Sequence, residues 1–488
     1  QDRINSLGFF QDKFEIKQTP GSAADRVVLE ANVEERSTGQ LQLSAGFSSL
    51  ERFIIQANIT QNNFRGKGQT LSAGVNYSTY SKSIQLGFTE PYVFDKNIAL
   101  GVDVFRRDYN AFNFIGTNRN TTYSQVSTGF QIRTGVPLTE YWQLAGRYQF
   151  SYDEVGLDEN SFYTNGRCDP LKAGRYLCDS LGNRLTSSVG YSLIFDSLNS
   201  RLRPTAGQRF VFSQDFAGLG GDVKYIRSKL DFSKFVNLGG GFIGSFVGEG
   251  GYIKSLEKSR GEGVDRIRIN DRFYLGEPQF RGFDIRGVGP RVQRRYYTTD
   301  SAGKQVLITD RDQLVDDALG GTAYYLGRFE VEIPLGSGAR EMGLRPSIYA
   351  QFGSLFNITE PLPTATFPTT TDANGNTVVL PLPVKDTAGN PLYSYVNAAG
   401  VLVPTTCAAG LPNGNGGCNG IVPNSAQIAS QPFEERFLGN SARPRVSVGI
   451  GVNWNSPFGP LRIDLAKALI SQPGDDRKLI TFNVGTQF

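Results

Sequence analysis

Apolar and polar residues alternate along many short stretches of this chain. The stretch KLITFNVGTQF, residues 478–488, places Ile480, Phe482, Val484 and Phe488 on one face and polar residues or glycine on the other. The stretches QLQLSAGF at 40–47, RVSVGIGVNW at 445–454 and LRIDLA at 461–466 alternate in the same way. A period of two residues is typical of a β-strand with one apolar and one polar face. The pattern therefore predicts an all-β protein.

About sixteen segments show this alternation, an even number as closed bacterial barrels require. They begin near residues 39, 52, 69, 82, 97, 122, 141, 183, 207, 223, 241, 320, 343, 445, 460 and 477. Short connections such as NLGGG and SPFGP alternate with more variable ones, of which the longest span about 153–182, 255–319 and 354–444. Short turns at one end and long loops at the other are typical of an outer-membrane barrel. We therefore predict a 16-stranded antiparallel transmembrane β-barrel over 37–488. A soluble β-sandwich is the alternative, but it needs a second sheet to cover every apolar face.

Bulk composition narrows the classes of function. Basic and acidic residues number 50 and 46, for a net charge of +4, which is too balanced to indicate nucleic-acid binding. The chain has no histidine, which excludes Ser-His-Asp hydrolysis, Cys-His chemistry and His-ligated zinc. Arg462 and Asp464 resemble a polar site, but ion pairs that line a barrel lumen are commoner than catalytic ones. We expect no enzymatic activity, no metal and no cofactor.

Four cysteines form two local pairs in the sequence. Cys168 and Cys178 are ten residues apart, and Cys407 and Cys418 are eleven apart. Neither spacing is that of a zinc site. The preferred interpretation is two disulfides, Cys168–Cys178 and Cys407–Cys418, in an oxidising compartment. Four free thiols are the alternative.

Two regions do not fit the barrel pattern. Residues 1–36 contain RINSLGFFQDKFEI, typical of the end of a helix that leads into a strand, and RVVLEANVEER, typical of a second strand. We interpret 1–36 as the C-terminal part of a small α/β domain that is cut at its N-terminal side. Residues 357–443 are rich in Pro, Thr, Asn, Gly and Ala and are too long for a plain connector. We expect a mobile or partly disordered external loop there.

Several motifs together make the chain resemble the BamA family of outer-membrane β-barrel assembly factors over essentially its whole length. In order, they are TGQLQLSAGFSS, NNFRGKGQ, TEPYVFD, RGFDIRGVGPR, NWNSPFGPLRIDLAKAL and TFNVGTQF. The resemblance implies that 1–36 belong to the last periplasmic POTRA domain. TamA-like and two-partner secretion barrels share the Arg-Gly-Phe/Tyr motif and the GPLRIDLA style, so a translocation barrel of that kind remains an alternative. A passive pore is a further alternative, although a pore does not usually carry a POTRA remnant or a plugging loop.

The resemblance implies a function in which β-barrel proteins are folded and inserted into the bacterial outer membrane without ATP. The expected partners are unfolded outer-membrane β-barrel proteins, accessory lipoproteins of the BAM assembly complex, the lipid bilayer and periplasmic chaperones, with the POTRA side in the periplasm. The family is thought to open the seam between its first and last strands, here about 39–49 and 478–488. We expect the lateral gate to comprise Leu41, Leu43, Ala45 and Phe47 of the first strand and Ile480, Phe482, Val484, Gly485 and Phe488 of the last. Gly485 either weakens the seam by permitting a kink or relieves crowding inside the barrel.

The stretch QFRGFDIRGVGPR, residues 279–291, is called the loop motif below. It lies in the long connection of about 255–319, between the eleventh and twelfth predicted strands. In the family this motif folds into the lumen, and its arginine pairs with acids on the wall. Here the motif residues are Arg281, Gly282 and Phe283, and strand parity makes Glu330 the expected wall partner. The family's second acid falls on Gln351, a neutral amide. We therefore expect Glu330 to hold Arg281 alone, or Glu332 to substitute for the missing acid.

Overall fold

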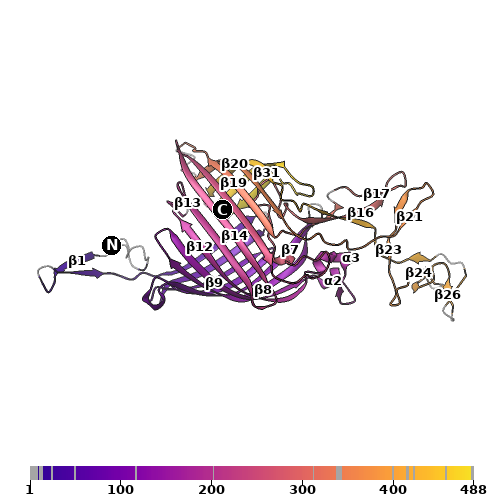
Figure 1. Ribbon diagram of the computed structural model, residues 1–488, viewed down its shortest axis with the longest axis horizontal. Coiled ribbons are helices and arrows are strands. Elements are labelled where there is room, and N and C mark those ends of the chain that lie inside the picture. Colours follow the sequence, from indigo (N-terminus) through magenta and orange to yellow (C-terminus); the bar gives the residue numbers. More distant parts are fainter. Residues whose placement is uncertain are drawn as a thin grey trace.

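The computed structural model is a β-barrel with additions at both ends (Figure 1). It describes residue 9 and residues 15–23, 26–48, 51–115, 118–201, 203–310, 313–336, 343–397, 400–413, 417–420, 424–456 and 459–484. The expected helix end before the first strand, and Gly485 and Phe488 of the expected gate, lie outside these residues.

Sixteen long strands form the closed barrel, so the predicted 16-stranded antiparallel fold is confirmed. In chain order they are β3 (Gly39–Ser48), β4 (Arg52–Phe64), β5 (Gln69–Ser78), β6 (Ser81–Glu90), β7 (Ala99–Ile115), β8 (Asn118–Pro137), β9 (Trp142–Gly156), β12 (Gly182–Asp196), β13 (Gly207–Gly221), β14 (Tyr225–Gly239), β15 (Phe242–Ser255), β19 (Ala323–Glu332), β20 (Leu344–Phe356), β31 (Arg445–Ser456), β32 (Gly459–Ile470) and β33 (Ile480–Val484). Each pairs with the next, including β15 with β19 and β20 with β31 across long connections, and β3 pairs with β33 to close the ring.

The barrel has an apolar exterior and a polar interior. Leu86 and Val104 are paired across β6 and β7 and are 54% and 53% exposed on the outer face. Asp103, the neighbour of Val104, is only 6% exposed and lies 2.7 Å from Nε of Arg133 on β8. Such alternation suits a barrel whose outer face contacts lipid and whose lumen is polar.

The long connections build a cap over one end of the barrel. The β9–β12 connection contains β10 (Tyr163–Thr164), β11 (Arg167–Cys168), α2 (Glu159–Phe162), α3 (Pro170–Ala173) and α4 (Arg175–Cys178), and a disulfide joins Cys168 to Cys178. The β15–β19 connection contains a 3-10 turn at Ile269–Asp271, β16 (Arg291–Thr299), β17 (Gln305–Leu307) and β18 (Val315–Ala318). β16 pairs with both β18 and β30 (Phe433–Leu438), and β18 pairs with the end of β7. The cap is therefore one sheet that continues from the barrel wall.

The connection expected to be mobile or partly disordered forms an arm of short strands over its described residues. Figure 1 shows this arm projecting from the capped end, away from the hairpin of β1 (Glu15–Pro20) and β2 (Val27–Asn32). Its strands are β21 (Thr369–Thr371), β22 (Thr377–Val379), β23 (Leu382–Pro383), β24 (Tyr393–Val396), β25 (Leu402–Thr405), β26 (Leu411–Pro412), β27 (Cys418–Asn419), β28 (Ser425–Ala426) and β29 (Ile428–Ser430). A second disulfide joins Cys407 to Cys418.

A repeated turn explains why this low-complexity segment forms hairpins. The carboxylates of Asp372 and Asp386 each accept a hydrogen bond from the backbone N–H four residues later, at 2.7 and 2.8 Å. In each turn a glycine lies three residues after the aspartate: Gly375 has φ of +84° and Gly389 has φ of +89°. An Asp-x-x-Gly sequence supplies both the side-chain acceptor and the left-handed residue that such a turn requires.

Buried apolar side chains gather inside the mouth of the barrel. One cluster includes Phe280, Phe283 and Val288 of the loop motif, packed with Leu326 and Leu355 of the wall. No helix in the described part of the chain has the length and apolar character to cross a membrane.

Candidate functional site

The loop motif lies inside the barrel. Phe280 and Phe283 are fully buried, and their ring centroids are 4.7 Å apart. Gly282 has φ of +88°, and a Cβ atom at this position would lie 3.0 Å from Cβ of Ser447 on β31. Only glycine adopts this left-handed backbone without a steric cost, and it permits a close approach to the wall. The Arg-Gly-Phe sequence therefore places a charged side chain and an aromatic ring against the lumen wall.

Arg281 contacts two acids from different strands. Its Nη1 is 3.5 Å from Oε2 of Glu330 on β19, and its Nε is 3.6 Å from Oδ1 of Asp464 on β32. Its guanidinium also stacks over the ring of Tyr349, with Cζ 4.5 Å from the centroid. The side chains of Arg281, Glu330 and Asp464 are 7%, 11% and 2% exposed. Ion pairs in so little water are weakly screened.

Both acids are held by further arginines. Nη2 of Arg462 is 3.0 Å from Oε1 of Glu330, and its Nε is 2.8 Å from Oδ2 of Asp464. Nε of Arg328 lies 3.5 Å from Oε2 of Glu330, the oxygen that Arg281 also contacts. Ser347 donates a 2.6 Å hydrogen bond to Glu330. Three arginines thus share two carboxylates, so loss of either acid leaves buried positive charge without compensation.

The structure corrects two sequence-based expectations about this network. Glu330 does not hold Arg281 alone, because Asp464 is the second acid. Glu332 does not substitute either: its ion pair is with Arg345, at 3.6 Å. Gln351 has a different role, since its Oε1 accepts the backbone N–H of Arg281 at 2.9 Å and its Nε2 donates to the carbonyl of Gln279 at 2.9 Å.

Strand parity could have identified Asp464. It lies on the polar face of LRIDLA together with Arg462, and both were interpreted as a lumen ion pair. The sequence contains no signal that the loop motif reaches β32 as well as β19, because the path of a long connection depends on the tertiary structure. Parity correctly places Glu330 and Asp464 on the lumen side but does not say which of them meets Arg281.

A second arginine of the loop motif, Arg286, reaches the opposite wall. It donates a hydrogen bond to the hydroxyl of Tyr109 on β7, and its Cζ lies 4.2 Å from the ring centroid of Tyr274. β7 is the fifth barrel strand and β20, which carries Gln351, is the thirteenth, so they are eight strands apart in a ring of sixteen. The loop motif therefore crosses the lumen from one wall to the other. Sequence analysis missed this contact.

Tyr109, Tyr123 and Tyr274 surround Arg286 and are called the tyrosine cage below; they affect its protonation. Burial alone would lower the pKa of Arg286, but the neighbouring phenols of Tyr109, Tyr123 and Tyr274 raise it above its usual value. Burial raises the pKa of Tyr274 well above its usual value, and Tyr123 adds to this effect. Arg286 therefore remains a cation, and Tyr274 remains a neutral ring that attracts it.

The seam between β3 and β33 joins the first and last strands of the barrel. Among the described residues it has two, Phe47 with Val484 and Ser48 with Asn483. On their other sides, β3 forms ten pairs with β4, and β33 forms five with β32. The expected gate residues Leu41, Leu43, Ala45 and Phe47 are exposed on the outer face of β3, as are Ile480 and Phe482 on β33. Most of the free edge of β3 has no strand partner in the described part of the chain.

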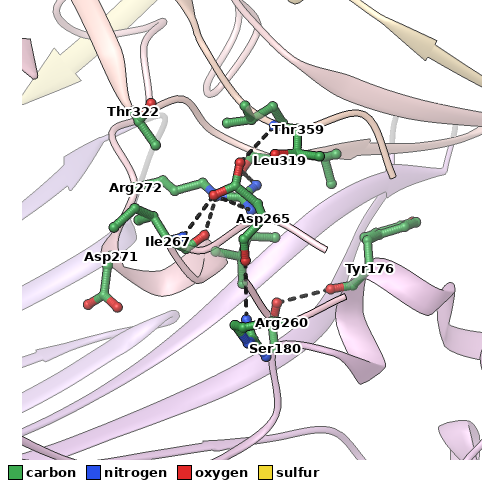
Figure 2. Close-up of polar contacts among 12 residues, drawn as sticks. Tyr176, Ser180, Arg260, Asp265, Ile267, Asp271, Arg272, Leu319, Thr322 and Thr359 are labelled. Atoms are coloured by element: carbon green, nitrogen blue, oxygen red, sulfur yellow. Dashed lines mark hydrogen bonds and ion pairs between the residues drawn. The ribbon is translucent and has the colours of Figure 1, made fainter. Parts of the chain in front are cut away.

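Asp265, in the β15–β19 connection, joins it to the β20–β31 connection within the cap (Figure 2). Its Oδ2 accepts the backbone N–H of Thr359 at 2.7 Å, and its Oδ1 accepts that of Ile267 at 2.8 Å. Arg272 lies 3.9 Å from the Asp265 carboxylate and donates to the carbonyl groups of Ile267 at 2.9 Å and Leu319 at 3.0 Å. The cap is therefore held by polar contacts between loops that are distant in sequence.

The same cap contains a buried phenol. Tyr176 donates a hydrogen bond to Asp317 of β18, and burial, together with the Asp317 carboxylate, raises the pKa of Tyr176 well above its usual value. The phenol therefore keeps its proton at neutral pH and fastens the disulfide-closed loop to the cap sheet. Among the described residues, no group of three or more Cys, Asp or Glu side chains is arranged to hold a metal ion.

Comparison with known proteins places this geometry in context. Residues 63–488 match the Omp85 superfamily domain. The chain is 27% identical over 488 residues to the outer membrane protein assembly factor BamA of Neorickettsia risticii, covering 100% of this chain and 50% of the relative. It is 23% identical over 508 aligned positions to BamA of Neisseria meningitidis serogroup B, covering 100% of this chain and 52% of the relative. The chain thus spans about half the length of these curated relatives.

A solved structure shares the fold. The crystal structure of BamA from Haemophilus ducreyi lacking POTRA domains 1–3 aligns with a TM-score of 0.66 at 21% identity. The alignment covers 100% of this chain and 77% of that chain.

Proposed function

Because the chain belongs to the Omp85 superfamily, we propose that it is the barrel part of a factor that assembles and inserts β-barrel proteins into the bacterial outer membrane. The observation that carries the proposal is that the barrel closes between its first and last strands, β3 and β33; among the described residues two pairs join them, whereas β3 forms ten pairs with β4 and β33 forms five with β32. The names of the curated relatives, outer membrane protein assembly factors, support the same function.

The physical problem in this reaction is that backbone groups lack hydrogen-bond partners in the membrane. Each free N–H or C=O group of a strand that enters hydrocarbon costs several kcal/mol. When the seam opens, the edge of β3 supplies a row of donors and acceptors to which an incoming strand can pair by β-augmentation. No nucleotide and no catalytic residue are needed, because the new hydrogen bonds and lipid burial supply the free energy.

The side chains of the seam suit this role. Leu41, Leu43 and Phe47 are 65%, 70% and 42% exposed, so they meet lipid while the backbone edge is used for pairing. Thr481 and Asn483 of β33 are buried on the lumen side. In our proposal these outward and inward residues of β3 and β33 form the two sides of the lateral gate.

The loop motif has a supporting part in the proposal. The Arg281 network and the tyrosine cage around Arg286 hold it across the lumen, which disfavours a passive pore. Residues 1–36 are proposed to end the last POTRA domain on the periplasmic side. Unfolded barrel proteins, accessory lipoproteins and periplasmic chaperones are the proposed partners at that side.

A locked seam tests the proposal. Ser48 and Asn483 are Cα partners across the seam, and paired antiparallel residues lie within disulfide range. The full-length protein with Ser48→Cys and Asn483→Cys is reconstituted in liposomes with an unfolded barrel substrate, before and after reduction. We expect assembly only after reduction.

The matched control is a lock away from the seam. Ser192 and Ser213 are Cα partners on β12 and β13, and their hydroxyls are 2.9 Å apart. Cysteines at these positions should form a disulfide that leaves assembly unchanged. Equal assembly by the seam-locked and reduced proteins would exclude lateral opening, and a large stable conductance without assembly would favour a pore.

A further inference from the structure

The loop motif is hydrogen-bonded to the turn that precedes the last strand. This turn, residues 471–479 between β32 and β33, is called the gate turn below. The backbone N–H of Asp284 donates to the carbonyl of Asp476 at 2.9 Å, and that of Asp476 donates to the carbonyl of Gly287 at 2.8 Å. The N–H of Lys478 donates to the carbonyl of Gly282 at 3.2 Å. Phe283 and Arg477 form an antiparallel bridge, so the two segments make a short ladder.

Lys478 adds an ionic contact to this ladder. Its Nζ lies 2.7 Å from Oε2 of Glu277 and 3.4 Å from Oδ1 of Asp284. The Glu277 side chain is 1% exposed, whereas Lys478 is 28% exposed. Both acids belong to the connection that carries the loop motif. A carboxylate as buried as Glu277 needs its cation, so this pair favours one position of the gate turn relative to the loop.

Two more arginines hold the gate turn. Nη1 of Arg291, at the end of the loop motif, donates to the carbonyl of Gly474 at 2.5 Å. Arg445 of β31 forms a two-point ion pair with Asp475, at 3.0 and 3.1 Å, and both side chains are fully buried. The turn is thus attached to the loop motif on one side and to the wall on the other.

We propose that this ladder couples the position of the loop motif to the position of β33, with Lys478 as a positioning residue; this inference rests on the proposed function, in which β33 is a seam strand. Lys478 is two residues from Ile480, where β33 begins. Because each residue of the main chain has a fixed maximum length, two residues leave little slack between the ladder and β33. A shift of the ladder therefore moves the start of β33. Such coupling is reciprocal, so a withdrawn loop favours an open seam, and an open seam favours a withdrawn loop to the same degree.

The test uses two reporters in the full-length protein in liposomes without substrate. The first is the rate of disulfide formation between Ser48→Cys and Asn483→Cys, which reports seam closure. The second is the rate of maleimide labelling of Ile285→Cys, because Ile285 is 3% exposed and reports the seating of the loop motif. Lys478→Ala and Glu277→Gln are each combined with both reporters. We expect each to slow seam cross-linking and to speed labelling by about fivefold, the lower end of typical coupling between sites.

Lys467→Ala is the matched control, because Lys467 is an exposed lysine on β32 of the same hairpin. Lys467→Ala should leave both rates unchanged. Lys478→Arg keeps the positive charge, so its cross-linking and labelling rates should lie close to those of the unmodified protein. If Lys478→Ala and Glu277→Gln expose position 285 while the seam rate equals that of the control, the coupling is refuted. Equality of both rates with the control refutes it as well. Because no substrate is present, a failure of assembly bears on the proposed function alone.

Discussion

Arg281 of the loop motif and Asp464 of β32 lie 3.6 Å apart, from Nε to Oδ1, and both side chains are less than a tenth exposed. This contact places a second acid beside Arg281 although the strand next to Glu330 carries Gln351 instead. Asp464 of β32 supplies the acid that β20 lacks, and Gln351 of β20 accepts the backbone N–H of the same arginine.

We expect Arg281→Ala, Glu330→Ala and Asp464→Ala each to lower stability and assembly. Each removes one member of a buried ion network, which typically costs about 3–5 kcal/mol. The measurement is unfolding by denaturant in detergent, combined with the level of folded protein in the membrane. Double-mutant cycles should show coupling of Arg281 to both acids, of about 0.5–3 kcal/mol. Additive effects for Arg281 and Asp464 would mean that this contact contributes nothing.

Arg286→Ala should release the other end of the loop motif. Its contact with Tyr274 is a cation–π interaction in a dry site, worth about 2 kcal/mol, and its hydrogen bond to Tyr109 is also lost. We expect larger ionic conductance across a planar bilayer than for the unmodified protein. Tyr109→Phe, which keeps the ring and removes the hydroxyl, should give a smaller increase. Unchanged conductance in Arg286→Ala would show that Arg281 holds the loop without this second contact.

Gly282→Ala should destabilise the loop motif although it adds only one methyl group. The backbone at Gly282 has φ of +88°, and the new Cβ would lie 3.0 Å from Cβ of Ser447. A left-handed backbone costs about 1–2 kcal/mol for an L-residue. Thermal unfolding should show the loss. The control is Gly336→Ala, where nothing lies within 4 Å of the added Cβ and the backbone is outside the left-handed region. Equal stability of the two variants would contradict the close approach.

Asp265→Ala should loosen the cap without affecting assembly. The substitution removes the acceptor of the Thr359 and Ile267 N–H groups and the partner of Arg272. Buried donors without partners cost about 1–3 kcal/mol each. We expect faster proteolysis within the β15–β19 and β20–β31 connections of the intact protein. Asp300→Ala, in the β16–β17 turn, is a suitable control because its hydrogen bonds are local. Loss of assembly in Asp265→Ala would show that the cap has a direct part in the reaction.

Local pattern was sufficient for the strands. The alternation in residues such as Leu41 and Leu43 or Ile480 and Phe482 depends only on the two-residue period of a β-strand, and the predicted starts lie close to those observed. The low-complexity segment was harder to predict. Its Asp-x-x-Gly turns are local signals, yet their regular repetition into an arm was not recognised among so many Pro, Thr and Asn residues.

The sequence by itself determined the strand number and the lumen-facing side of Glu330 and Asp464, because each depends on neighbours within a few residues. Only the tertiary structure decided that Arg281 meets Asp464, that Arg286 crosses to Tyr109, and that Lys478 pairs with Glu277. Those contacts join residues from distant parts of the chain. Their geometry is set by barrel closure and by the path of a long loop through the lumen, and neither leaves a periodic trace in the sequence.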